Sequence, residues 1–173
     1  MANWLNISDF VDDIQLSSSS IAAVNTAFDN TLGRFQVEFL RTVLGAKMYN
    51  DLLTGLVVTP TPDAKWTNIQ NGCDFIYSDN ETYHLAGLKE ALKQFSYARY
   101  QQVISTVATV QSNVIKKSEI AIVVEPTGKV VKAINTCIDM IEELKLYIDW
   151  KVDDYPDFIY ASPFSNRANH FGI

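Results

Sequence analysis

Residues 85–107 are the longest helix-compatible stretch between turn signals, and no proline interrupts them. Apolar and long side chains recur there every three or four positions, which is the spacing of one face of an α-helix. That face comprises Leu85, Leu88, Leu92, Phe95, Arg99, Gln102 and Thr106. We therefore expect a central helix over 85–107 whose first half packs in the protein core.

The second half of this helix carries a large aromatic and polar surface. Tyr97, Arg99, Tyr100 and Gln102 stand where a monomer would need mainly apolar residues. Tyrosine and arginine are enriched where protein surfaces bury each other. We expect these four residues to contact another copy of the chain. Because Arg99 lies on the apolar stripe, it should pair with a carboxylate, either within the protomer or across the interface.

Two further long helices are expected, one before and one after the central helix. Residues 21–44 and 130–151 both show apolar spacings of three and four. Leu44-Gly45 resembles a helix end, after which residues 46–53 restart as a short second helix. Residues 66–72 are long enough to form one more helical turn.

Residues 72–85 have a different pattern, which predicts a short β-hairpin. Strand-forming residues lie on both sides of the turn sequence Ser78-Asp79-Asn80. A lone two-stranded hairpin is only marginally stable in water. It should therefore pack on the helices or on a neighbouring subunit, with Phe75 and Tyr77 as candidate contacts.

The C-terminal residues 155–173 form an aromatic tail that contains two prolines and only two charged side chains. Its aromatic residues are Tyr155, Phe158, Tyr160, Phe164 and Phe171. Disordered tails are usually poor in aromatics, so docking on a partner is the favoured interpretation. Packing on its own core and disorder remain alternatives. The predicted fold is mainly α: a bundle of about four helices in residues 1–154, with a hairpin between the second and third main helices and an extended C-terminal tail.

Charge and composition restrict the functional classes. The net charge is −6, and residues 1–84 hold ten acids against four bases, whereas residues 85–173 hold ten of each. This balance disfavours nucleic-acid binding through clustered lysine and arginine. No apolar run approaches the roughly 18 residues that a membrane span requires, so we expect no membrane partner. The first residues also lack the basic and apolar blocks of a signal peptide.

Recognisable catalytic and metal-binding patterns are missing from the sequence. The two histidines, His84 and His170, have no second ligand at metal-binding spacing. Phosphate-binding glycine loops and the Gly-x-Ser-x-Gly motif are absent. Cys73 and His84 would lie on a small hairpin without a third orienting group, so we interpret them as structural. We therefore expect a protein that is not an enzyme and holds no cofactor or metal.

An ordered set of motifs resembles a known family. Its parts are Leu44-Gly45-x-x-Met48-Tyr49-x-x-Leu52, Trp66-x-x-Ile69-x-x-Gly72, the hairpin with Phe75 and Tyr77, and Gly87-Leu88-x-x-Ala91-Leu92-x-x-Phe95-x-Tyr97-Ala98-Arg99-Tyr100. Over roughly residues 20–150 this order resembles the head-to-tail connector (adaptor) proteins of tailed bacteriophages. The versions it is most similar to come from phages of Bacteroides and their relatives, including the crAss-like group.

The resemblance implies a structural virion protein that forms a ring, usually of twelve copies, beneath the portal at one capsid vertex. Such a ring joins portal to tail, contacts further tail or ring proteins, and extends a channel through which double-stranded DNA passes without sequence-specific binding. It would be assembled in the host bacterial cytoplasm. A ring uses two different surfaces of each copy. An acidic lumen would let DNA pass without sticking to the channel wall. Another virion assembly or tail-completion module is the alternative, and an enzyme of unrecognised type is a third hypothesis.

Overall fold

The computed structural model describes residues 3–11, 14, 22–58, 62–111 and 127–158, with side chains described outside 22–28, 102–111 and 127. The elements in these ranges are arranged in the order η1 (Ile7–Asp9), α1 (Ala22–Gly55), α2 (Ala64–Asn71), β1 (Cys73–Ile76), β2 (Thr82–Leu85), α3 (Leu88–Gln111), α4 (Thr127–Trp150) and η4 (Val152–Asp154). The predicted fold class is confirmed: the protein is mainly helical, with an antiparallel hairpin between α2 and α3.

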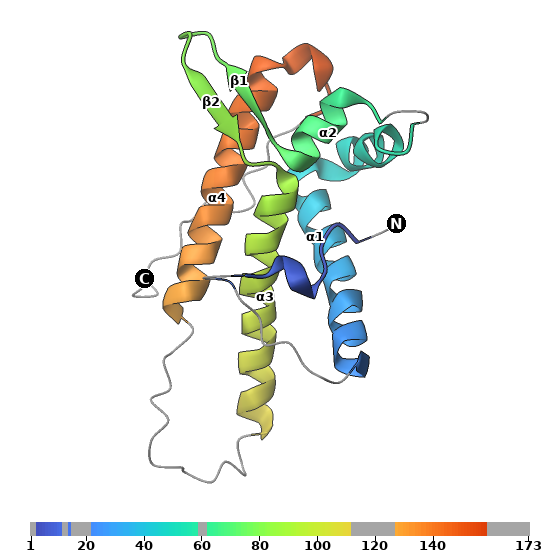
Figure 1. Cartoon of the computed structure of the whole chain (residues 1–173), viewed down its shortest axis with the longest axis vertical. Helices are drawn as coiled ribbons and strands as arrows, with labels where there is room; N and C mark the ends of the chain where they lie inside the picture. Colours follow the sequence, from blue (N-terminus) through green and yellow to red (C-terminus); the bar gives the residue numbers. More distant parts are fainter. Residues whose placement is uncertain (1–2, 12–13, 15–21, 59–61, 112–126, 159–173) are drawn as a thin grey trace.

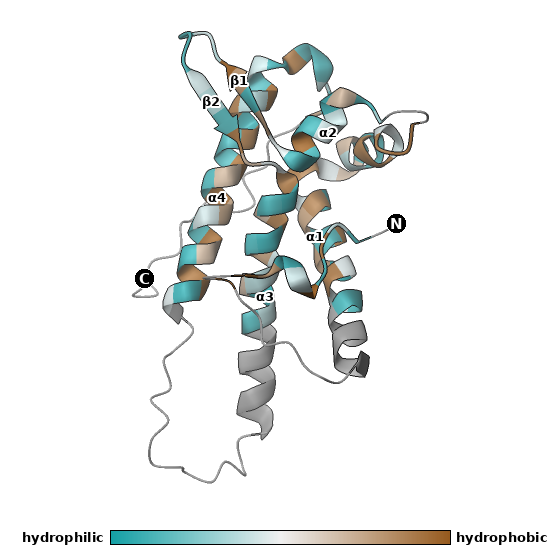
Figure 2. Ribbon diagram, in the orientation of Figure 1, coloured by the Kyte–Doolittle hydropathy of each residue, from teal (hydrophilic) through white to brown (hydrophobic). Residues whose placement is uncertain are grey.

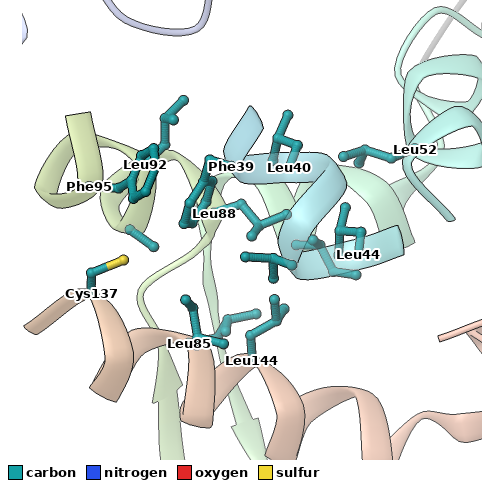
Figure 3. Packing of buried hydrophobic residues seen from close by; sticks show 14 of the residues in the cluster. Phe39, Leu40, Leu44, Leu52, Leu85, Leu88, Leu92, Phe95, Cys137 and Leu144 are labelled. Carbon is teal, nitrogen blue, oxygen red and sulfur yellow. The ribbon is translucent and has the colours of Figure 1, made fainter. Parts of the chain in front are cut away.

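Helix α3 is the centre of the molecule, with α1 on one side and α4 on the other (Figure 1). Phe95 of α3 packs against two rings of α1, with its centroid 5.2 Å from Phe39 and 6.4 Å from Phe35. Leu88 and Leu92 are also fully buried in this core (Figure 3). The expected role of the first half of α3 as core is therefore confirmed.

A third layer comes from the N-terminal segment, residues 3–11 and Ile14, which crosses α3 towards α4 (Figure 1). Leu5, Phe10 and Ile14 are buried in the same core as the helices. The segment is fixed to α1 by a 2.8 Å hydrogen bond from the backbone N–H of Trp4 to Oε1 of Gln36. Helix α3 is consequently enclosed by α1, α4 and this segment.

Helix α1 bends sharply at Gly45, where φ is 74° and ψ is 168°. A side chain would rarely adopt this backbone conformation, so glycine permits the kink. Non-helical backbone at Gly45 separates two helical parts of α1, so the predicted helix end at Leu44-Gly45, followed by a second helix, is confirmed. The part beyond the kink returns Met48 and Leu52 to the core.

The central helix begins three residues later than the periodicity predicts. Leu85 is the last residue of β2, and Gly87, with φ of 86°, separates the strand from α3 at Leu88. Leu85 is fully buried, and Figure 3 shows it beside Leu144 of α4. The prediction that Leu85 belongs to the helix was wrong because one buried leucine satisfies both a helical stripe and a strand's alternating pattern.

The hairpin has one face towards the helices and one towards solvent. Cys73 pairs with Leu85, Asp74 with His84, Phe75 with Tyr83 and Ile76 with Thr82. Alternation along the strands places Phe75 inward, where its ring centroid lies 5.1 Å from Tyr147 and 5.3 Å from Trp150 of α4. Packing on the helices of the same chain therefore stabilises this small sheet.

Candidate protein-binding surfaces

The aromatic surface expected on the second half of α3 is largely internal. Tyr97 is only 3% exposed, so its side chain belongs to the protomer core and cannot meet another copy. The N-terminal segment lies along the side of α3 opposite α1 and α4, where Leu5 and Asp9 line a pocket together with Lys89 and Lys93. Tyr97 belongs to the same core cluster as Leu5, Phe10 and Ile14 of this segment.

Arg99 pairs within the protomer. Its Nη2 atom lies 3.1 Å from Oε1 of Glu38, and the two side chains are 44% and 47% exposed. The expected pairing with a carboxylate is confirmed, and of the two alternatives the intramolecular one is found. Tyr100 is half-buried and packs against the core. The side chain of Gln102 lies outside the described residues.

The beginning of the aromatic tail packs on its own protomer. Tyr155 is buried, with its ring centroid 5.6 Å from that of Trp66 and 6.2 Å from that of Tyr147. Burial is the main reason why the pKa of Tyr155 is raised, so the phenol stays neutral. Phe158 is also partly buried against the core.

Docking on a partner is therefore the wrong interpretation for Tyr155. Residues 152–154 are exposed and Tyr155 is buried, so the first residue of the expected tail packs with the helical body. The remaining tail residues predicted as contacts, Tyr160, Phe164 and Phe171, lie outside the described residues.

Of the two hairpin candidates, Phe75 packs on the helices of its own chain, and Tyr77 stays partly accessible. Phe75 is buried against α4, so it holds the hairpin in place and is no contact surface. Tyr77 is half-buried, with its ring 6.0 Å from that of Tyr83. The exposed apolar residue of this strand is Ile76, which was not among the predicted contacts although it alternates with Phe75.

Three apolar side chains at the hairpin end of the molecule are open to solvent. Ile76 is 57% and Val152 59% exposed, and the ring of Trp150 is partly open to solvent. Ile76 lies on the outer face of β1, whereas Trp150 and Val152 lie at and just after the end of α4, beside the hairpin (Figure 2). We call Ile76, Trp150 and Val152 the hairpin-end surface.

Trp150 is held firmly in this surface. Its ring stacks on Phe75, and Nζ of Lys151 lies 4.3 Å from its centroid. Both contacts fix the ring before any partner arrives. An ordered aromatic side chain loses little conformational entropy on binding, which favours its use as an anchor.

The described residues show no arrangement resembling a catalytic or metal site. Within them, no three His, Cys, Asp or Glu side chains gather closely enough to hold a metal ion. Cys73 points inward on the hairpin, whereas His84 points outward, where its Nδ1 lies 2.7 Å from Oδ1 of Asp74. Burial raises the pKa of Cys73, which disfavours the nucleophilic thiolate. None of the helices in the described ranges is long and apolar enough to span a membrane.

Comparison of the chain with protein families, curated proteins and solved structures finds no match.

Proposed function

We propose that this chain is a structural protein of a tailed-phage virion, which assembles into a ring that joins the capsid portal to the tail. The ordered motif set is one support. The hairpin-end surface is the structural observation that carries the proposal, because it presents Ile76, Trp150 and Val152 at one end of an elongated helical protomer (Figure 1). Repeated around a ring, these ends would form one circular apolar surface.

A circular surface of this kind suits a contact along the ring axis. Each copy would bury an ordered tryptophan and two aliphatic side chains against the portal, and burial of apolar area is the main favourable term in such associations. The acids Asp153 and Asp154 lie next to this surface and are exposed. They would form the polar rim of the contact.

The proposal is tested by electron microscopy of the full chain, alone and mixed with the portal protein encoded by the same genome. We expect closed rings with a central channel, which bind one face of the portal. A chain that neither forms rings nor binds the portal would refute the proposal.

Two matched variants test the role of the hairpin-end surface. Ile76→Glu places a charge in the apolar contact and should weaken portal binding at least tenfold, since desolvating an unpaired carboxylate is unfavourable. Val11→Glu makes the same chemical change at another exposed apolar position and should leave binding unchanged. Equal effects of both variants would remove the hairpin-end surface from the proposal.

A further inference from the structure

The two outer helices present faces of different charge on opposite sides of α3. The α1 outer face is formed by Asn30, Arg34, Val37 and Arg41, together with Gly33 and Glu38, and is open and shallow. Figure 1 shows α1 and α4 separated by α3. A contact that used both outer helices would therefore engage two opposite flanks of the protomer.

The α1 outer face is positively charged. Its single acid, Glu38, is neutralised by Arg99. The guanidinium of Arg41 lies 5.3 Å from the centroid of Tyr49, which orients it at the surface. Arg34 is exposed and forms no ion pair within the described part of the chain. These two arginines are half of the four bases in the first 84 residues.

The α4 outer face carries more acids than bases. Cys137, Ile141 and Leu144 point into the core, so the opposite side of the helix carries the exposed acids Asp139, Glu142 and Glu143, together with the exposed base Lys132. Lys145 is engaged with Asp149, at 3.1 Å between Nζ and Oδ2. Over the ranges that the structure covers, Glu143 forms no ion pair.

We infer that the α1 outer face of one copy receives the α4 outer face of the next copy in the ring. This inference rests on the proposed ring, for which it names the lateral contact. Ring closure requires a heterologous contact between two different surfaces of the same chain. The basic α1 outer face and the acidic α4 outer face, on opposite flanks, satisfy that requirement. Their charges attract each other and repel a copy in the reverse orientation.

Charge reversal at the two unpaired residues tests the contact. Arg34→Glu removes the net positive charge of the α1 face, and Glu143→Lys makes the α4 face less acidic. Neither change removes an ion pair between described residues, so folding should be preserved, and circular dichroism and the thermal midpoint check this. Self-association of the full chain is measured by sedimentation over a range of concentrations at low salt.

We expect each single variant to associate at least about tenfold more weakly than the wild type, which is the effect of roughly one lost charge pair. The chain with both changes should return to within about threefold of wild-type association, because the reversed charges attract again. An equimolar mixture of the two single variants should also assemble better than either alone. Glu81→Lys, which reverses an exposed charge outside both faces, should have no effect.

The inference is overturned if the single variants associate like the wild type, if the double variant does not recover, or if the wild-type chain stays monomeric at every concentration. Its failure is distinct from that of the proposed function. Rings that bind the portal but ignore these reversals would refute only the lateral contact. A chain that assembles through these faces but does not bind the portal would refute only the proposed function.

Discussion

The hydroxyl of Tyr155 donates a 2.8 Å hydrogen bond to the backbone carbonyl oxygen of Lys65, 90 positions earlier in the chain. The same ring packs edge-on against Trp66, in the first turns of α2. The chain segment after α4 is thereby attached to α2, which leads directly into the hairpin. The hairpin, α2 and the end of α4 consequently form one connected unit beneath the hairpin-end surface.

Replacing Tyr155 with phenylalanine should lower the free energy of unfolding by about 1 kcal/mol, because the hydrogen bond is lost in a buried place while the ring contacts stay. Urea denaturation measures the change. Tyr83→Phe is the matched control: its hydroxyl donates a 2.7 Å hydrogen bond to Oδ2 of Asp79 at the surface, and its loss should have a clearly smaller effect. An equal effect of the two substitutions would contradict the anchoring role of Tyr155.

Two truncations distinguish the anchored start of the tail from its remaining residues. A chain that ends at Asp154 loses the buried Tyr155 ring, whereas a chain that ends at Phe158 keeps it. We expect the shorter chain to be less stable by about 3 kcal/mol, in the range found when a buried aromatic side chain is removed. Thermal unfolding monitored by circular dichroism compares them. Identical midpoints would show that Tyr155 contributes little to the fold.

Much of the fold could be predicted because its helices and hairpin have strong local patterns. The stripe through Leu88, Leu92 and Phe95 identifies α3, and the turn at Ser78-Asp79-Asn80 identifies the hairpin. The start of α3 could not be placed in the same way. Leu85 fits both the helical and the strand periodicity. The boundary between β2 and α3 depends on the positive φ of Gly87, which cannot be read from a hydrophobic periodicity.

The candidate surfaces were harder to predict because burial depends on contacts distant in sequence. Tyr97 belongs to one core cluster with Leu5, Phe10 and Ile14, which lie more than 80 positions earlier, and this burial has no signature near residue 97. An aromatic tail indicates docking but not the surface on which it docks. Tyr155 finds Trp66 and the Lys65 backbone of its own chain. Conversely, Ile76 was missed because its outward orientation depends on the strand register.

Cys137 should make stability depend on pH in the alkaline range. Burial raises the pKa of its thiol from 9.0 to about 12 in the folded protein. Above pH 9 the unfolded chain releases this proton while the folded chain keeps it, so the free energy of unfolding falls as pH rises towards 12. The loss attributable to Cys137 should reach about 1.4 kcal/mol at pH 10.

The Cys137→Ala variant isolates this contribution from that of the tyrosines. It should be less stable than the wild type at pH 8, since a buried side chain is shortened. The difference between the two proteins should then shrink by about 1.4 kcal/mol between pH 8 and pH 10. Urea denaturation at both pH values measures it. A constant difference would mean that Cys137 ionises in the folded protein as readily as in the unfolded chain.

Gly72 and Gly45 form a matched pair for testing how closely Gly72, at the end of α2, approaches Leu85, the last residue of β2. Their backbones are similar, with φ of 89° and ψ of 163° at Gly72 and φ of 74° and ψ of 168° at Gly45. A Cβ atom at Gly72 would lie 2.2 Å from the backbone oxygen of Leu85, whereas at Gly45 it would meet nothing within 4 Å. Substitution by alanine therefore imposes comparable backbone strain at both sites but a steric clash at only one.

We expect Gly45→Ala to lower the free energy of unfolding by about 1–3 kcal/mol, the cost of holding a side chain in this backbone region. Gly72→Ala should cost about 1–3 kcal/mol more, because the base of the hairpin must move away from Leu85. Chemical denaturation gives both values, and amide exchange of residues 73–76 shows whether the added loss is local to the hairpin. Equal destabilisation by the two substitutions would mean that the strand ends at Gly72 and Leu85 are not in close contact.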